Sequence, residues 1–208
     1  MIAIARISEL AIWKQEQQNV GKLSVIELTR RGVDIQQGIE SRLEDIQRRL
    51  GIREDCPDSA CCQKPAIPAG LTILVITRIF ASSALTYLHS TISGPHPSLP
   101  EIEKSVKDTI EGFKLLSGPK MMRNLVWPFV VTACLATGQE RVFMEVVMRR
   151  MEMGEELDGD GAMGMCAGFG VVREVWRRRD AGEGRGFDWV RGEGEDGAEE
   201  GKGRVLLV

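Results

Sequence analysis

The chain has 208 residues, of which 43% are hydrophobic and 27% charged, and its formal net charge at pH 7 is −3. This length suits one domain or slightly more, with a core of aliphatic side chains and methionine because aromatic residues are scarce. The balance of charge excludes the basic surface of an autonomous nucleic-acid binder. Five cysteines, an odd number, argue against a secreted disulfide scaffold.

The N-terminal residues and the length of the apolar stretches indicate where the protein is located. The first residues lack the basic and apolar regions of a signal peptide. The apolar stretches fall short of the ~20 residues that span a bilayer. We therefore expect an intracellular protein with no membrane partner.

Hydrophobic spacing predicts two amphipathic helices in residues 1–50, the first over 2–19 and the second over 24–50. The second carries charged side chains on one face, while Gly32 and Gly38 weaken its middle. Its apolar face has helical spacing and consists of Ile35, Ile39, Leu43, Ile46 and Leu50.

Residues 51–70 are rich in proline and glycine and predict a linker. The linker contains Cys56, Cys61 and Cys62 but no histidine. A structural zinc site needs four ligands, commonly in two close pairs, so we expect no metal here.

Residues 71–180 predict a helical core, with helices over 71–88, 99–116, 127–136, 141–153 and 163–178. Leu125–Ala136 stands out, because a Trp-Pro pair opens an unbroken apolar run. Proline fits the first turn of a helix, and a run that is apolar on every face indicates a helix buried in a helical core.

Residues 181–208 are mostly glycine and charge, with the apolar island Phe187–Val190. Such a segment buries too little to offset its ordering entropy, so we expect a disordered tail. The predicted fold is all-α, an antiparallel array of about seven helices.

No catalytic, cofactor-binding or metal-binding residues are predicted. Cys134 and Cys166 stand among apolar and small residues, which raise a thiol pKa and make it unreactive. His89 ends an apolar helix, where a cation favours the helix dipole, and His96 is expected in an exposed loop. The glycines of 164–170 lack the spacing of a phosphate or dinucleotide loop and favour close helix packing.

Two basic clusters, Arg149–Arg150 and Arg177–Arg179, are compatible with a nuclear-localisation or phosphate contact. A solvated helix face or partners of helix C-termini are favoured instead. Trp127, Trp176 and Trp189 are interpreted as core anchors, whereas Trp13 is left open between the core and a partner contact.

The chain resembles the fungal-specific transcription factor domain, the helical regulatory domain that follows a zinc-cluster DNA-binding module in filamentous fungi. The resemblance rests on the order of Trp127-Pro128-Phe129, Glu140-Arg141 and Val175-Trp176 within 72–190. It also includes Tyr87-Leu88-His89. The six cysteines of the zinc cluster are absent from this chain, which has either lost the cluster or is a fragment.

The resemblance implies a transcriptional regulator in the nucleus, not an enzyme. It implies protein partners in the transcription machinery or a homodimer partner, an unidentified small-molecule effector, and DNA contact only through the absent zinc cluster. The alternative is a helical protein–protein interaction module with no direct role at DNA, which exposed apolar surface on residues 25–50 would favour.

Overall fold

The computed structural model describes residues 2–51, 69–116, 123–153 and 160–182, which contain seven α-helices and no strand. The all-α prediction is confirmed. Residues 52–68 of the predicted linker with its three cysteines, Trp189 and the predicted tail beyond residue 182 lie outside the described residues. Helix α3 begins at Ala69, so the last two residues of the predicted linker are helical. Contacts divide the chain into two compact units, Met1–Ser117 and Gly118–Val208. The predicted domains, 1–50, 51–70, 71–180 and 181–208, stay a prediction.

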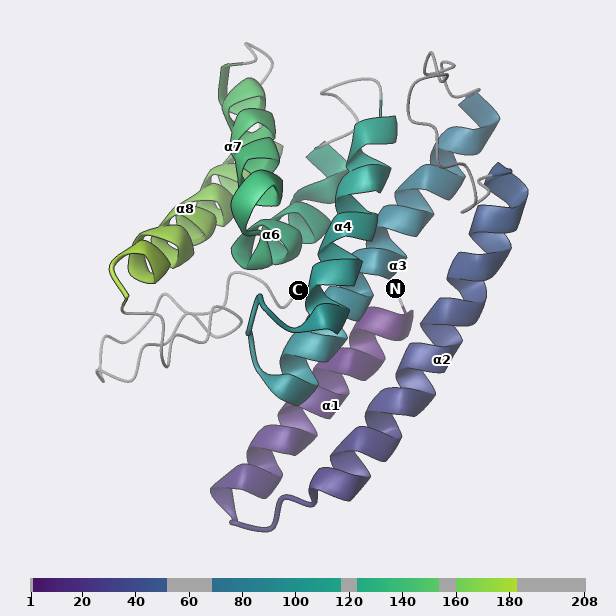
Figure 1. The fold of residues 1–208 in the computed structure, drawn as a ribbon, viewed down its shortest axis with the longest axis vertical. Helices are drawn as coiled ribbons and strands as arrows, with labels where there is room; N and C mark the ends of the chain where they lie inside the picture. The colour runs from purple at the N-terminus through teal and green to yellow at the C-terminus, as the bar shows by residue number, and fades with distance from the viewer. Residues whose placement is uncertain (1, 52–68, 117–122, 154–159, 183–208) are drawn as a thin grey trace. The chain divides into compact units, whose positions relative to one another are not determined.

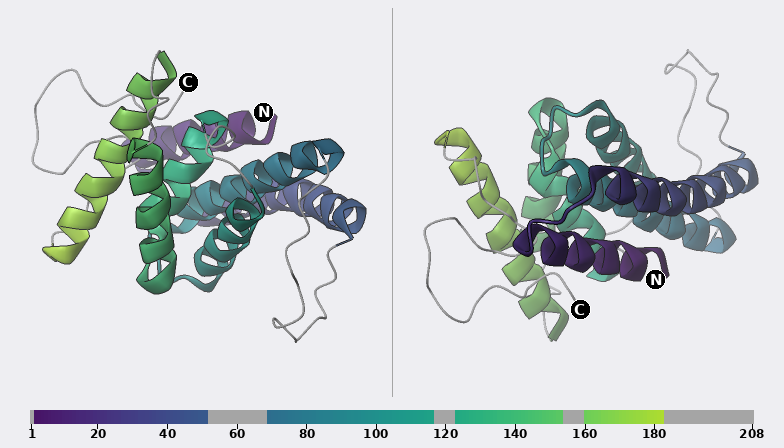
Figure 2. Two further views of the ribbon diagram at one scale, coloured as in Figure 1. Left: turned by 90° about the horizontal axis from the view of Figure 1, so that it is seen from above. Right: turned by 90° about the horizontal axis from the view of Figure 1, so that it is seen from below.

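The first unit contains α1 (Ile2–Asn19), α2 (Val25–Leu50), α3 (Ala69–Ser93) and α4 (Pro100–Leu115). Each helix runs roughly opposite to the one before it (Figure 1). Helix α3 packs against the other three, and α1 also lies beside α2, as the view from below in Figure 2 shows. The antiparallel arrangement is therefore observed within this unit.

Local sequence signals explain where α2 and α4 begin and end. The hydroxyl of Ser24 accepts a hydrogen bond from the Glu27 amide over 3.3 Å, which caps α2. Gly51 follows α2 with a φ of 66°, a left-handed conformation that suits glycine. Pro100 opens α4, with Glu101 in its first turn.

Helix α3 is longer than the predicted 71–88, and its stretch Gly70–Ser93 is long and apolar enough to cross a membrane by length and composition alone. This corrects our expectation that no apolar stretch reaches that length, because the helix runs past both predicted ends. More than half of its most apolar window is buried, as in the core helix of a soluble protein. The buried hydroxyls of Ser83, Thr86 and Ser90 bond to carbonyls one turn earlier in the helix.

The second unit contains the 3₁₀ turn η1 (Arg123–Leu125), α6 (Val126–Leu135), α7 (Gly138–Met153) and α8 (Asp160–Asp180). Helix α6 contacts both α7 and α8. Every residue of α6 from Pro128 to Leu135 is buried, which confirms the prediction of a core helix that begins at the Trp-Pro pair. For this unit, an antiparallel arrangement stays a prediction.

The core anchors of the second unit differ in part from the predicted ones. Trp176 is buried, as predicted, but Trp127 is only half-buried. Its place is taken by Phe129, which is 1% exposed and packs edge-on against Phe169 with ring centroids 5.4 Å apart. The apolar run could not show which of its aromatic residues points inward, because every position in it is apolar.

Candidate functional site

Two of the residues that carry the family resemblance, Arg141 and Trp176, meet near the C-terminal end of α6. The indole N–H of Trp176 on α8 donates to the carbonyl oxygen of Ala133 over 2.8 Å. The guanidinium of Arg141 on α7 lies 4.9 Å from the centre of the Trp176 ring and pairs with Asp180 through two bonds of 2.6 and 2.7 Å. Three helices are thus joined by polar contacts at one point.

The basic cluster Arg177–Arg179 takes part in the same assembly. Arg179 donates to the carbonyl oxygens of Cys134, in the last turn of α6, and of Ala136, directly after the helix. Carbonyl groups at a helix C-terminus lack partners within the helix. Arg177 and Arg178 bond to Glu174, and these bonds lower the pKa of that carboxyl to about 2. The cluster is therefore engaged within the protein, in agreement with the structural interpretation that the sequence favoured.

The two candidate nucleophiles lie in different surroundings. Cys134 is buried, and burial raises the pKa of its thiol to about 12, as predicted, so that it stays protonated at neutral pH. Cys166 is exposed, so the prediction of apolar surroundings is wrong for it.

The two histidines lie on either side of the C-terminal end of α3, with His89 inside the helix and His96 beyond it. Helix α3 continues to Ser93, so His89 does not stand at its C-terminus, and burial lowers the pKa of its imidazole. This corrects the expectation of a cation that favours the helix dipole. His96 is exposed in the loop before α4, as predicted.

The described residues contain no group of three or more histidine, cysteine or acidic side chains that could hold a metal ion. The glycines of α8 serve packing at one position: a Cβ on Gly168 would lie 2.7 Å from Cγ2 of Val130 on α6. At Gly170 a Cβ would meet nothing within 4 Å. The close-packing interpretation therefore holds for Gly168.

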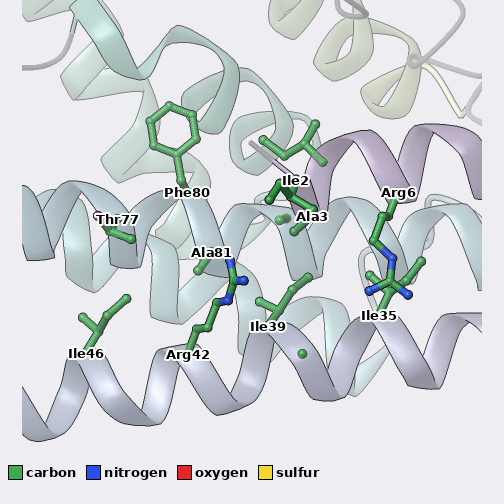
Figure 3. Close-up of a pocket in the computed structure, with 13 residues that line it drawn as sticks. Ile2, Ala3, Arg6, Ile35, Ile39, Arg42, Ile46, Thr77, Phe80 and Ala81 are labelled. Atoms are coloured by element: carbon green, nitrogen blue, oxygen red, sulfur yellow. The ribbon is translucent and has the colours of Figure 1, made fainter.

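The first unit contains an open groove of about 160 Å³ between α1, α2 and α3 (Figure 3). Apolar side chains form most of its wall, among them Ile35, Ile39 and Phe80. Two cationic side chains complete it: Arg6 from α1 and Arg42 from α2. We call it the arginine-rimmed groove; it is lined by Ile2, Ala3, Ile4, Arg6, Ile35, Gly38, Ile39, Arg42, Ile46, Thr77, Phe80, Ala81 and Ala84.

The lining of the arginine-rimmed groove includes no acidic side chain. Figure 3 shows Arg42 extending from α2 toward Ala81 and Arg6 extending from α1 toward Ile35. Neither arginine was predicted as a site residue. One signal was present, because Arg42 follows Ile39 by three residues and precedes Ile46 by four, at a position on the apolar face of α2.

These features define an all-α fold without a metal cluster among its described residues. It has a polar junction at the buried helix α6 and an open groove between α1, α2 and α3. The sequence model of the fungal-specific transcription factor domain matches residues 1–195, and the chain belongs to this family. The match confirms the resemblance and extends it from 72–190 to α1 and α2.

The curated relatives that the chain matches are fungal transcription regulators. The trichothecene biosynthesis transcription regulator TRI10 of Trichoderma arundinaceum is 36% identical over 69% of this chain and 29% of its own length. TRI10 of Fusarium sporotrichioides is 28% identical over 86% of this chain and 37% of its own length. The ustiloxin B cluster transcription factor ustR of Aspergillus flavus is 26% identical over 86% of this chain and 29% of its own length.

The chain therefore spans between 29% and 37% of the length of these three relatives. No solved structure matches the chain.

Proposed function

We propose that this chain is the regulatory, non-DNA-binding part of a fungal transcription factor that controls a set of biosynthetic genes in the nucleus. The observation that carries the proposal is the family match over 1–195. The names of the relatives supply the biosynthetic setting, since two regulate trichothecene biosynthesis and one is a factor of the ustiloxin B cluster.

The charge of the chain supports a role away from DNA. Phosphate binding gains affinity from lysine and arginine side chains that displace counterions, and this chain has no overall excess of them, with 27 basic against 30 acidic residues. In the second unit, six arginines bond to carboxylates or backbone carbonyls within the protein. DNA contact would then come from a zinc cluster outside this chain, and the proposed partners are proteins of the transcription machinery.

The proposal is tested by fusing residues 1–208 to an unrelated sequence-specific DNA-binding domain upstream of a reporter gene in a filamentous fungus. We expect the fusion to change reporter output, while the same chain without the added domain does not. A gel-shift assay of the purified chain is the second measurement. Zinc-dependent, sequence-specific binding by this chain alone would overturn the proposal.

A second candidate is a helical protein–protein interaction module. It is favoured by Val25 and Ile26 at the start of α2, which are 68% and 84% exposed. On the predicted apolar face of α2, Ile35, Ile39 and Ile46 are buried and Leu43 and Leu50 are half-buried. The exposed large apolar side chains of α2 are therefore those at its start and Val33. Light scattering over a range of concentrations separates the candidates: a dimer that Ile26→Ser dissociates supports the module.

A further inference from the structure

We propose that the arginine-rimmed groove binds a small monocarboxylic acid with a compact apolar body, whose carboxylate lies between Arg6 and Arg42. The inference deepens the proposed function, on which it rests, by giving the regulatory domain a class of effector. Four features of the described residues support it: charge, wall chemistry, size and the glycine in the wall.

The charge of the groove is not compensated within the part of the chain that the structure describes. Neither Arg6 nor Arg42 makes an ion pair with a described residue, whereas Arg30, Arg31 and Arg48 of α2 each pair with a carboxylate of the same helix. Glu9 and Asp34 line a neighbouring hollow, which shares Arg6 and Ile35 with the groove, but neither carboxylate is within ion-pair distance of Arg6. Two guanidinium groups from facing helices at one opening favour an anion, for which arginine has a planar fork of donors.

The rest of the wall favours an apolar body on the anion. Ile39 of α2 and Phe80 and Ala84 of α3 contribute apolar surface, and Thr77 is the polar residue among the lining residues besides the two arginines. Burial of apolar surface provides the main favourable free energy for such a ligand. An inorganic anion would leave this surface exposed to water.

The size of the groove sets an upper limit on the ligand. Its volume is about 160 Å³. An apolar cavity of about 150 Å³ holds one benzene molecule, whereas sites for drug-sized ligands occupy about 300–1,000 Å³. The groove therefore has room for one ring or a short branched chain.

Gly38 in the wall of the groove is the most specific of these features. In the middle of a helix, glycine costs about 1 kcal/mol relative to alanine. At Gly32 packing accounts for it, because a Cβ would lie 2.3 Å from Cδ1 of Ile92 on α3. At Gly38 a Cβ would meet nothing within 4 Å, and the residue lines the groove. An added Cβ here meets no neighbour, and a larger side chain would extend into the groove.

The test measures binding of 3-phenylpropanoate to the full chain by isothermal titration calorimetry and ligand-observed NMR, with 3-phenylpropanamide as the uncharged probe. We expect saturable binding of the acid and at least tenfold weaker binding of the amide. Arg6→Gln and Arg42→Gln should each weaken binding about tenfold, the magnitude of one charge-assisted hydrogen bond. Arg48→Gln, which removes an exposed arginine outside the groove, should leave binding unchanged.

Gly38→Leu should abolish binding and leave the thermal midpoint unchanged or raised. Its matched control is Gly170→Leu, at a helical glycine of α8 where a Cβ also meets nothing within 4 Å. Absence of saturable binding of the acid, equal binding of acid and amide, or unchanged binding by Gly38→Leu would each overturn the proposal. If Gly38→Leu fails to fold, the exposed variant Arg42→Gln decides in its place.

Failure of this inference is distinguishable from failure of the proposed function. If the wild-type fusion changes the reporter but the acid does not bind, the ligand site is wrong and the regulatory role stands. Binding with the expected pattern of variants, together with a fusion that does not change the reporter, supports the ligand site and removes the regulatory role.

Discussion

Trp176 and Ala133 are 43 residues apart, yet the indole N–H of the first donates to the carbonyl oxygen of the second over 2.8 Å. Both residues are buried. The carbonyl lies in the last turn of α6, where it has only a longer bond of 3.3 Å from the Ala136 amide. A buried tryptophan thus combines a large apolar contact with the satisfaction of a helix end.

Trp176→Phe tests the hydrogen bond apart from the ring. Phenylalanine keeps most of the apolar contact but removes the donor, and we expect a loss of about 1 kcal/mol in the free energy of unfolding. Trp13→Phe is the matched control, because the half-buried Trp13 ring contacts Arg31 through its face, 4.3 Å from the guanidinium carbon. Urea unfolding followed by circular dichroism measures both variants. Equal losses in the two would show that the Ala133 bond contributes nothing.

Gly168→Ala tests the close approach of α8 to α6. The added Cβ would lie 2.7 Å from Cγ2 of the buried Val130, so one of the two helices must shift. We expect a destabilisation of about 1–3 kcal/mol, the usual range for overpacking. Gly170→Ala, two residues on and without a neighbour within 4 Å, should instead stabilise by up to about 1 kcal/mol. A thermal midpoint that rises in both variants contradicts the packing role of Gly168.

The helices of this fold were predictable because their signals are local. Helix α6 begins at Val126, next to the predicted start at Trp127, since proline tolerates the first turn and the apolar run ends at Ala136. Helix α4 likewise begins at its Pro-Glu sequence. These signals are contained in four or five neighbouring residues, so no knowledge of the partner helices is needed.

The candidate site was not predictable in the same way. The arginine-rimmed groove is built from α1, α2 and α3, and its volume depends on how three separate segments pack. In the sequence, Gly38 only weakens a helix, and Arg42 is one charge among many on α2. Their meaning depends on which residue of another helix lies opposite, which hydrophobic spacing within one helix does not determine.

Phe129→Ala tests which aromatic residue of the Trp-Pro-Phe motif anchors the second unit. Phe129 is 1% exposed and packs against Phe169. Its removal should cost about 3–5 kcal/mol, the range for a buried phenylalanine. Trp127→Ala should cost less, because the Trp127 side chain is half-buried. Chemical unfolding of the two variants checks the order, and a larger loss for Trp127→Ala would reverse the assignment.

His89 should make the stability of the protein depend on pH. Burial lowers the pKa of its imidazole below the ordinary 6.5, an effect that Glu101 and Glu40 partly oppose. The unfolded state therefore binds a proton more readily than the folded state. The contribution of His89 to the free energy of unfolding is fully present above pH 6.5. It falls as the pH drops from 6.5 toward the lowered pKa of the folded state.

His89→Gln removes this contribution, so the loss of thermal stability between pH 7.5 and pH 5.5 should be smaller in this variant than in the wild type. His96→Gln is the control, since His96 is exposed in the loop before α4, and it should keep the wild-type pH dependence. The measurement is the thermal midpoint by circular dichroism at both pH values. A pH dependence that His89→Gln leaves unchanged, or makes steeper, would show that burial does not hold the imidazole in its neutral form.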